Sequence, residues 1–178
     1  DESDAEWLGS VKTGVPRSEL AESDKMLLPS EVREMDVIAG ERMGGKPLWY
    51  ILGSADFYGY EIKVDGRVLI PRPETELLAE MAVKTAEKGD KVLDLCTGSG
   101  CIAVAVAKEG QKLGKDLAVT ASDVSEDALE VARENAEKNG ASVTFVKSDF
   151  LDGVKGKYNI IVCNPPYIKS GDITGLQR

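Results

Sequence analysis

Residues 92–100 have the sequence VLDLCTGSG, in which an apolar run contains one acid, Asp94, and then opens into a turn of small residues. Residues 101–107 carry no charge and have the composition of a buried helix. The stretch therefore predicts a strand, a tight turn and a helix. Gly98 and Gly100 allow the turn to approach a ligand closely, and the helix that follows begins with N–H groups that lack intrahelical partners. Such a turn can bind a nucleotide-like ligand.

Two further segments end in polar residues at the same predicted edge. Asp123 follows the apolar segment 117–121, and its carboxylate can accept hydrogen bonds from both hydroxyl groups of a ribose. The strand-like segment 158–163 is followed directly by Asn164, Pro165, Pro166 and Tyr167. Because ligands of open α/β sheets bind at the carboxyl ends of the strands, these segments predict a catalytic site there.

The second half of the chain alternates between strand and helix patterns. We expect strands at 91–95, 117–121, 143–147 and 158–163, and helices at 99–109 and 126–139. Ser125 is a suitable N-cap for the second helix, and Gly140 ends it. This alternation predicts a doubly wound α/β fold with a parallel sheet.

The first half of the sequence predicts a helical region, a hairpin with a linker, and the start of the α/β part. The expected domains are therefore 1–52, 53–73 and 74–178. Residues 1–52 are expected to be helical, with the clearest helix after Pro29, Ser30 as its N-cap and Gly44 at its end. Its predicted packing face consists of Val32, Met35, Ala39 and Met43. Residues 54–64 predict a β-hairpin. Pro73 then suits the first position of a helix, whose expected inner face consists of Leu77, Leu78, Met81 and Thr85.

Composition restricts the class of protein. The 178 residues are 42% hydrophobic and 30% charged, which is typical of a soluble globular chain. We expect a cytoplasmic protein, because the sequence shows neither a membrane-spanning apolar run nor a basic and apolar leader. The three cysteines, Cys96, Cys101 and Cys163, are expected to be small buried hydrophobes. Without any histidine, a zinc cluster or other metal site is not expected.

The net charge of −9 is concentrated in the first half of the chain. Residues 1–90 contain 19 of the 31 acids and 11 of the 22 bases, so the predicted nucleotide-binding half is nearly neutral. An acidic chain without a cluster of Lys and Arg is poorly suited to neutralise phosphates. DNA and RNA are therefore disfavoured as direct partners.

The glycine turn by itself leaves the ligand open. Residues 98–103 fit the G-x-G-x-x-G/A pattern and would suggest NAD, but that pattern alone is weak. Asp94 inside the first strand and the Asn-Pro-Pro-Tyr sequence at 164–167 argue against NAD, since a hydride-transfer site has no obvious use for the latter.

These motifs resemble those of a known enzyme family. Residues 92–100 resemble motif I of class I S-adenosylmethionine-dependent methyltransferases, and residues 164–167 resemble the motif with which such enzymes methylate a planar –NH2 group. Adenine methyltransferases and the HemK/PrmC family, which methylates a glutamine of peptide chain release factors, share that motif. The stretches 50–53, 57–59 and 69–76 resemble the HemK/PrmC branch, so the similarity extends over essentially the whole chain.

The resemblance implies a role for each motif residue. The methionine part of S-adenosylmethionine would be surrounded by Cys96, Thr97, Gly98, Ser99 and Gly100, and the ribose would be held by Asp123. Asp149 would reach the adenine amino group and Phe150 would flank the ring, although Asp149 can instead be a helix or turn cap and Phe150 a core residue. The chain departs from the family pattern at Cys96, where glycine is frequent, and at Phe150, where tryptophan occurs. The acceptor would contact Asn164, Pro165, Pro166 and Tyr167; of these, Asn164, Pro165 and Tyr167 would be catalytic, and Asn164 would also contact the cofactor.

The chemistry of an amide acceptor explains the Asn-Pro-Pro-Tyr sequence. The nitrogen lone pair of a glutamine amide is delocalised into the carbonyl, so the enzyme must orient it. The Asn164 side-chain oxygen and the Pro165 carbonyl can each accept one amide N–H, which directs the lone pair at a methyl group. Tyr167 can stack on the flat amide. A general base is not needed, because the nitrogen becomes acidic as it gains charge.

The family fold has seven strands in the order 3-2-1-4-5-7-6, whereas this sequence supplies four. We therefore expect a fragment trimmed at both ends, in which 158–163 forms an exposed apolar edge through which the fragment can self-associate, while the full-length protein would be a monomer. The expected function is methylation of the glutamine in the Gly-Gly-Gln loop of a release factor. The alternatives are an adenine-N6 or other amino-methyltransferase, or an inactive domain that binds S-adenosylmethionine.

Overall fold

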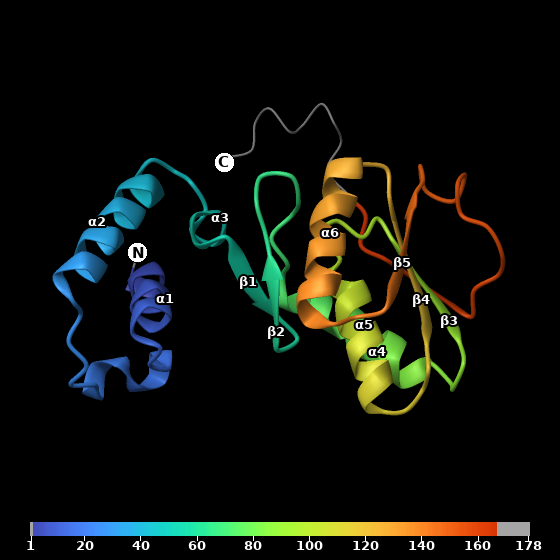
Figure 1. Cartoon of the computed structure of the whole chain (residues 1–178), viewed down its shortest axis with the longest axis horizontal. Helices are drawn as coiled ribbons and strands as arrows, with labels where there is room; N and C mark the ends of the chain where they lie inside the picture. Colours follow the sequence, from blue (N-terminus) through green and yellow to red (C-terminus); the bar gives the residue numbers. More distant parts are fainter. Residues whose placement is uncertain (1, 167–178) are drawn as a thin grey trace. The chain divides into compact units, whose positions relative to one another are not determined.

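The computed structural model describes residues 2–166, which belong to two compact units (Figure 1). The first unit extends from the N-terminus to Ile51, and the second begins at Leu52. None of the helices in the described range combines the length and the apolar character needed to cross a membrane.

The first unit is helical and has a small aromatic core. Its elements are α1 (Glu2–Thr13), the 3-10 helix η1 (Arg17–Glu22), α2 (Pro29–Met43) and α3 (Leu48–Leu52). The rings of Trp7 and Trp49 pack edge to face with their centroids 4.9 Å apart, and the Arg17 guanidinium lies 4.7 Å above the Trp7 ring. Leu8 and Leu48 are buried. These contacts hold α1 against η1 and α3.

Helix α2 differs from its prediction at both its start and its face. Pro29 takes the first helical position, so Leu28 is the N-cap and the predicted cap Ser30 is wrong. The carboxylate of Glu31 accepts the N–H of Leu28 at 2.6 Å, so the backbone donor of the N-cap residue is satisfied from within the helix. No residue of α2 is buried, and Met43 is 89% exposed, so the predicted face is not buried in the structure, although Met35 is half-buried.

The second unit starts with a hairpin and continues into an α/β layer. The hairpin consists of β1 (Ser54–Phe57) and β2 (Tyr60–Lys63), which pair antiparallel as predicted. The elements that follow are η2 (Pro73–Thr75), α4 (Glu76–Thr85), β3 (Lys91–Leu95), α5 (Cys101–Lys112), β4 (Ala118–Asp123), α6 (Glu126–Asn139), β5 (Val143–Lys147) and β6 (Ile160–Cys163). Pro73 starts a helical turn, in agreement with its expected position.

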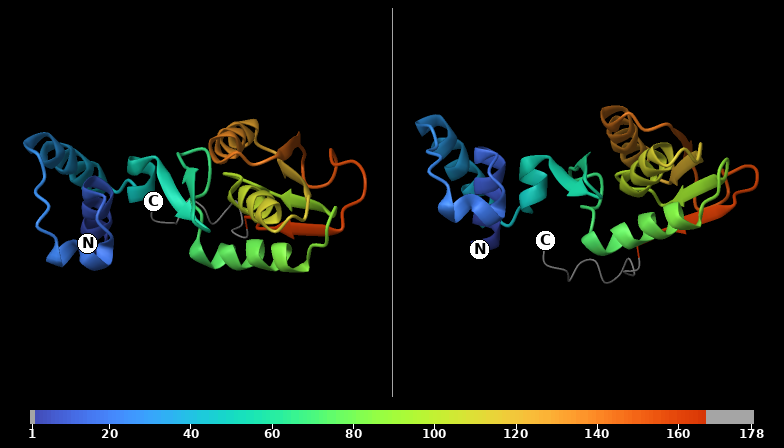
Figure 2. Two further views of the ribbon diagram at one scale, coloured as in Figure 1. Left: turned by 60° about the horizontal axis from the view of Figure 1, so that its bottom comes forward. Right: turned by 90° about the horizontal axis from the view of Figure 1, so that it is seen from below.

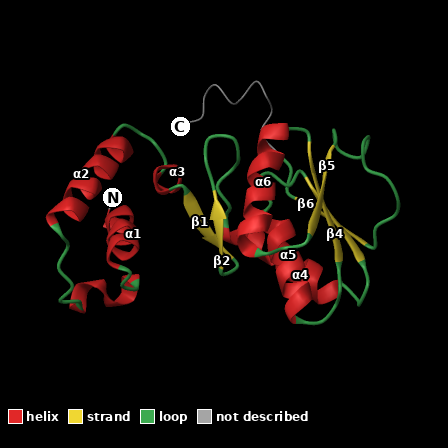
Figure 3. Ribbon diagram, in the orientation of Figure 1, coloured by secondary structure: helices red, strands yellow, loops and turns green. Residues whose placement is uncertain are grey.

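The four later strands form one parallel sheet in the order β5-β4-β3-β6 (Figure 3). This is the order expected for the first four strands of the class I methyltransferase sheet, so the α/β prediction is confirmed. Helices α4, α5 and α6 lie to the same side of the strands in Figure 1, and Figure 2 gives two further views of these elements. Strand β3 is central, and its register pairs Leu95 with both Ser122 and Cys163. The carboxyl ends of three strands therefore meet where the turn after β3 begins.

Local signals set most boundaries in this unit. The Ser125 hydroxyl accepts the N–H of Ala128 and caps α6, and Gly140 ends α6 in the left-handed conformation with φ 60°, both as predicted. Strand β6 begins at Ile160, two residues later than expected. It lies at one end of the described sheet, where Ile161 is 53% exposed.

The inner face of α4 was predicted incorrectly. Leu77 and Met81 are more than half exposed, whereas the buried residues are Ala79, Ala82 and Val83. Helix α4 packs closely against α5, whose residues from Cys101 to Val106 are all buried and include Ala103 and Ala105. The close approach of two helices favours small side chains at the contact, so the larger residues of α4 face outward.

Candidate functional site

The turn after β3 contains three left-handed residues in five. Cys96 has φ 61°, Gly98 has φ 55° and Gly100 has φ 78°. Glycine adopts this conformation without strain, whereas a residue with a side chain pays about 1 kcal/mol or more. This explains physically why glycine is the common residue at the position of Cys96, and it shows that the turn requires an unusual backbone.

Hydrogen bonds from β3 and β4 hold this turn, defined here as the cofactor turn (residues 96–100). The Thr97 N–H donates to the Ser122 carbonyl at 2.9 Å, and the Thr97 hydroxyl donates to Asp94 Oδ2 at 2.5 Å. The Gly98 N–H donates to Asp123 Oδ2 at 2.9 Å. The two acids that the sequence places at neighbouring strands therefore shape the same turn.

Asp123 ends β4 as predicted and is half-buried. Its second oxygen, Oδ1, accepts the N–H of Ser125 at 3.0 Å, so the carboxylate links the cofactor turn to the start of α6. A carboxylate oxygen can accept two hydrogen bonds, and each oxygen of Asp123 is shown with one. The side chain therefore retains the capacity to accept both hydroxyl groups of a ribose.

Asp94 is fully buried beneath the cofactor turn. Its Oδ2 also accepts the N–H of Ala103 at 3.1 Å, in the first turn of α5. Its Oδ1 is buried and has no hydrogen-bond partner among the described residues. Burial raises the pKa of this carboxyl to about 7, and the charge of Asp123 adds to that effect. Sequence reasoning noted Asp94 but did not place it in the site; its signal was an acid inside an apolar strand.

Asp94 should make the stability of the chain depend on pH near neutrality. The pKa of its carboxyl rises from 3.8 to about 7 on folding, so the folded chain holds a proton that the unfolded chain releases. This stabilisation is complete below about pH 4 and is lost as the pH rises through about 7. Between about pH 5.5 and 7.5 we expect the free energy of unfolding of the wild type to fall by about 2 kcal/mol relative to Asp94→Asn. Urea titrations at both pH values measure this, and parallel pH profiles of the two proteins would contradict it.

The Asn-Pro-Pro segment lies directly beside the cofactor turn. Because Cys163 pairs with Leu95, Asn164 follows β6 at the edge where Cys96 follows β3. Asn164 and Pro165 are half-buried and Pro166 is exposed. Tyr167, the fourth residue of this motif, lies outside the described residues. The structure thus brings together two motifs that are more than 60 residues apart in the sequence.

The cysteines are free thiols, and two of them meet at the cofactor turn. A hydrogen bond joins the thiols of Cys96 and Cys163, and burial raises the pKa of Cys96 to about 11. Cys101 is fully buried, and burial raises the pKa of its thiol to about 12. The expectation of buried small hydrophobes is confirmed for Cys101, whereas Cys96 and Cys163 are only half-buried. Thiols with raised pKa values are poor nucleophiles at neutral pH.

Asp149 and Phe150 follow β5 at the same edge of the sheet and are both exposed. Phe150 has φ 45°, and its carbonyl accepts the Ser148 hydroxyl at 2.7 Å. Its 55% exposure excludes the core role that the sequence left open. The Asp149 carbonyl, rather than its side chain, accepts the N–H of Asp152 in the turn.

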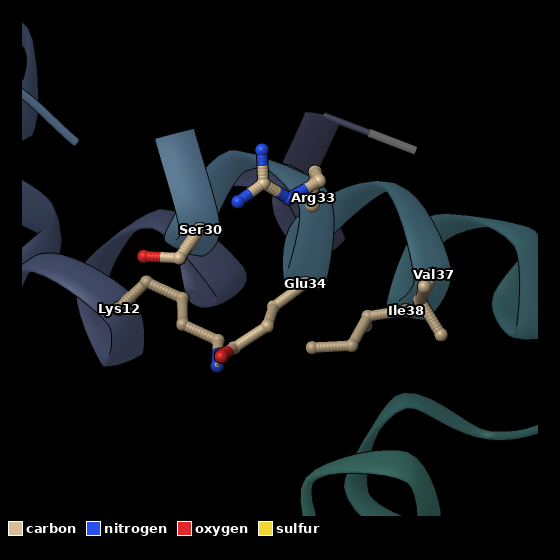
Figure 4. A pocket seen from close by; sticks show the side chains of 6 residues that line it. All are labelled: Lys12, Ser30, Arg33, Glu34, Val37 and Ile38. Carbon is tan, nitrogen blue, oxygen red and sulfur yellow. Dashed lines mark hydrogen bonds and ion pairs between the residues drawn. The ribbon is translucent and has the colours of Figure 1, made fainter. Parts of the chain in front are cut away.

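One pocket lies apart from this site. A pocket in the first unit is lined by Lys12, Ser30, Arg33, Glu34, Val37 and Ile38 (Figure 4). The Lys12 ammonium reaches Glu34 at 2.6 Å there, which lowers the pKa of the glutamate. This pocket contains none of the predicted site residues.

Within residues 2–166, side chains of His, Cys, Asp and Glu do not gather into a group that could hold a metal ion.

The chain is 51% identical over 128 residues to a release factor glutamine methyltransferase of Streptococcus pneumoniae, a match that covers 71% of this chain and 44% of the relative. It is 42% identical over 191 residues to the release factor glutamine methyltransferase of Chlorobaculum tepidum, covering 98% of this chain and 63% of the relative. The chain therefore spans about half the length of these curated relatives.

Solved structures show the same fold. A SAM-dependent methyltransferase from Agrobacterium tumefaciens superposes with a TM-score of 0.52 at 25% identity, covering 64% of this chain and 39% of that one. The T. thermophilus 16S rRNA N2 G1207 methyltransferase, solved with AdoMet and guanosine, has a TM-score of 0.54 at 24% identity and covers 66% of this chain and 33% of its own.

The sequence profile of one protein family covers the sheet and the site together. The profile of the methyltransferase small domain family matches residues 73–176. This range includes the cofactor turn, Asp123 and the Asn-Pro-Pro-Tyr segment, and it is more than half of the chain. The chain therefore belongs to the methyltransferase small domain family.

Proposed function

We propose that this chain provides the cofactor-binding and acceptor-orienting part of an S-adenosylmethionine-dependent methyltransferase. Its acceptor is the side-chain amide nitrogen of the glutamine in the Gly-Gly-Gln loop of a peptide chain release factor. The observation that carries this proposal is the pairing of β3 with β6, which places Asn164 beside the cofactor turn. The names of the curated relatives support the acceptor.

The residues present fit S-adenosylmethionine in three respects. The unpaired Oδ1 of Asp94 is a buried acceptor that suits an ammonium group such as that of the methionine part. Asp123 retains lone pairs for the ribose hydroxyl groups. Space is open at Gly98, where an added Cβ would meet nothing within 4 Å. Asp149 and Phe150, exposed at the end of β5, are the proposed adenine contacts.

The chemistry of the proposed reaction depends on orientation. When bound, S-adenosylmethionine supplies an electrophilic methyl group. The Asn164 side-chain oxygen and the Pro165 carbonyl accept the two N–H groups of the acceptor amide, so its nitrogen faces the methyl group. Pro165 and Pro166 have no N–H groups, so neither proline supplies a donor that competes for these oxygens. The proton that the amide then loses passes to water, and a histidine base is not required.

The charge and the thiols of the chain agree with this reading. A net charge of −9 disfavours a nucleic-acid acceptor. Three free cysteines are typical of a reducing compartment, which supports the expected location in the cytoplasm. The stacking role of Tyr167 and self-association through the β6 edge both stay predictions.

Transfer of labelled methyl from S-adenosylmethionine tests the proposal. Two proteins are assayed: this chain, and the Chlorobaculum tepidum relative with its matching part replaced by this chain. We expect the chimera to label a release factor and to leave unlabelled both DNA and a release factor whose Gly-Gly-Gln glutamine is changed to alanine. Label that appears in DNA would favour the adenine branch. A folded chimera that labels none of these would overturn the proposal.

A further inference from the structure

Asn135 is a fully buried amide on the inner face of α6. Its Nδ2 donates to the carbonyl of Ser99 at 2.9 Å and to the carbonyl of Lys63 at 3.0 Å. Its Oδ1 accepts the N–H of Lys63 at 2.6 Å. Both amide hydrogens and the oxygen are thus used, and they join residues that lie 36 and 72 positions away in the sequence. One side chain connects the last residue of the hairpin strand β2 with the cofactor turn.

The bond to Ser99 orients a peptide plane at the centre of the turn. The Ser99 carbonyl and the Gly100 N–H belong to one planar peptide unit. The Gly100 N–H donates to the Thr97 carbonyl at 2.9 Å and closes the turn. Asn135 therefore binds the carbonyl of the same peptide unit whose N–H closes the turn. Ala132, one helical turn earlier on α6, lies so close to Gly100 that an added Cβ would be 2.9 Å from its Cβ.

The other anchors of the turn do not replace this contact. Asp94, Ser122 and Asp123 bind Thr97 and Gly98, at the start of the turn. Among the hydrogen bonds of the described residues, the side-chain contact to the Ser99 carbonyl comes from Asn135. If it is lost, the Ser99 carbonyl has no donor among the described residues, and the bond from the Gly100 N–H to the Thr97 carbonyl holds the peptide unit from one side only.

We propose that Asn135 is a positioning residue for the cofactor turn, and that it couples the β1-β2 hairpin to that turn. The statement that the turn binds S-adenosylmethionine rests on the proposed function; the statement that Asn135 orients the turn does not. Asn135 touches no proposed ligand, so it acts through the Ser99 carbonyl.

Asn139 offers a matched control on the same helix. Its Nδ2 donates to the hairpin carbonyl of Glu61 at 3.1 Å and to the Asn135 carbonyl at 2.9 Å. It therefore contacts the hairpin without reaching the cofactor turn. Asn135→Ala removes the bridge, whereas Asn135→Leu removes it while keeping the buried volume filled. The leucine variant is needed because it leaves no cavity, so the loss of the hydrogen bonds is separated from the loss of packed volume in Asn135→Ala.

Amide hydrogen exchange in the chain without ligand is the first measurement. Relative to the Leu93 amide in the centre of β3, the Gly100 amide should exchange at least about tenfold faster in Asn135→Leu and Asn135→Ala. In Asn139→Ala that ratio should stay at the wild-type value. A wild-type ratio in a folded Asn135→Leu protein would overturn the proposal, because a residue that only packs or stabilises would change Gly100 and Leu93 together.

Calorimetric titration with S-adenosylmethionine is the second measurement. We expect affinity to fall about tenfold in Asn135→Leu and to stay within about twofold in Asn139→Ala, at a temperature where all variants are folded. Equal affinity of the two variants, with a wild-type exchange ratio, would reject a positioning role. If the wild type fails to bind the ligand, the proposed function fails, and the exchange ratio still decides the role of Asn135.

Discussion

Asn164→Ala should lower the rate of methyl transfer by about 10² to 10³-fold and leave the affinity for S-adenosylmethionine within about threefold of the wild type. The proposed contact of the Asn164 oxygen with the acceptor amide matters most when the nitrogen lone pair is aligned, so its loss raises the barrier rather than weakening ground-state binding. Single-turnover rates of the chimera with a release factor, together with cofactor titration, measure the two quantities separately.

Asn164→Asp is the matched variant for this prediction. A carboxylate retains a hydrogen-bond acceptor and loses the –NH2 donor, so partial activity would support the acceptor role. Full activity of Asn164→Ala with intact cofactor affinity would mean that Asn164 only shapes the turn after β6. Equal loss of rate and of affinity would instead place its main effect on cofactor binding.

Gly100→Ala should destabilise the chain by about 2 to 4 kcal/mol, through overpacking added to the strain of a left-handed alanine. The new Cβ would lie 2.9 Å from the Ala132 Cβ and 3.1 Å from its Cα, at φ 78°. Helix α6 cannot move away easily, because Asn135 holds it to the hairpin and the Ser125 N–H donates to Asp123 at the end of β4. Urea unfolding measures the loss, and cofactor binding should fall with it.

Gly98→Ala separates strain from overpacking. Gly98 also has positive φ, 55°, but an added Cβ there would meet nothing within 4 Å. We expect a loss of only about 1 kcal/mol. Adding Ala132→Gly to Gly100→Ala removes one of the two close contacts, so the double variant should be more stable than the sum of the single changes predicts. An equal loss of unfolding free energy in Gly98→Ala and Gly100→Ala would show that the contact with Ala132 of α6 does not determine which residue fits at position 100.

The alternation of strands and helices, and several of their ends, could be predicted from the sequence alone. The uncharged stretch 101–107 predicted a buried helix, and Ser125 and Gly140 predicted the ends of α6. Such signals act between residues a few positions apart, in a cap, a turn or a helical repeat. The strand order and the convergence of Asp123 with the cofactor turn followed from the family resemblance together with the rule that parallel strands present their carboxyl ends at one edge.

Only the tertiary structure decided which side chains support the site. Asn135 has the sequence signature of an ordinary helical residue, and its partners lie 36 and 72 positions away. The buried face of α4 was decided by its close contact with α5, which selected Ala79 and Ala82 over the larger Leu77. Burial likewise gives Asp94 its raised pKa and its unpaired oxygen. Local sequence patterns encode neither the distance between packed elements nor the partners of a buried polar atom, because both arise only when distant segments meet.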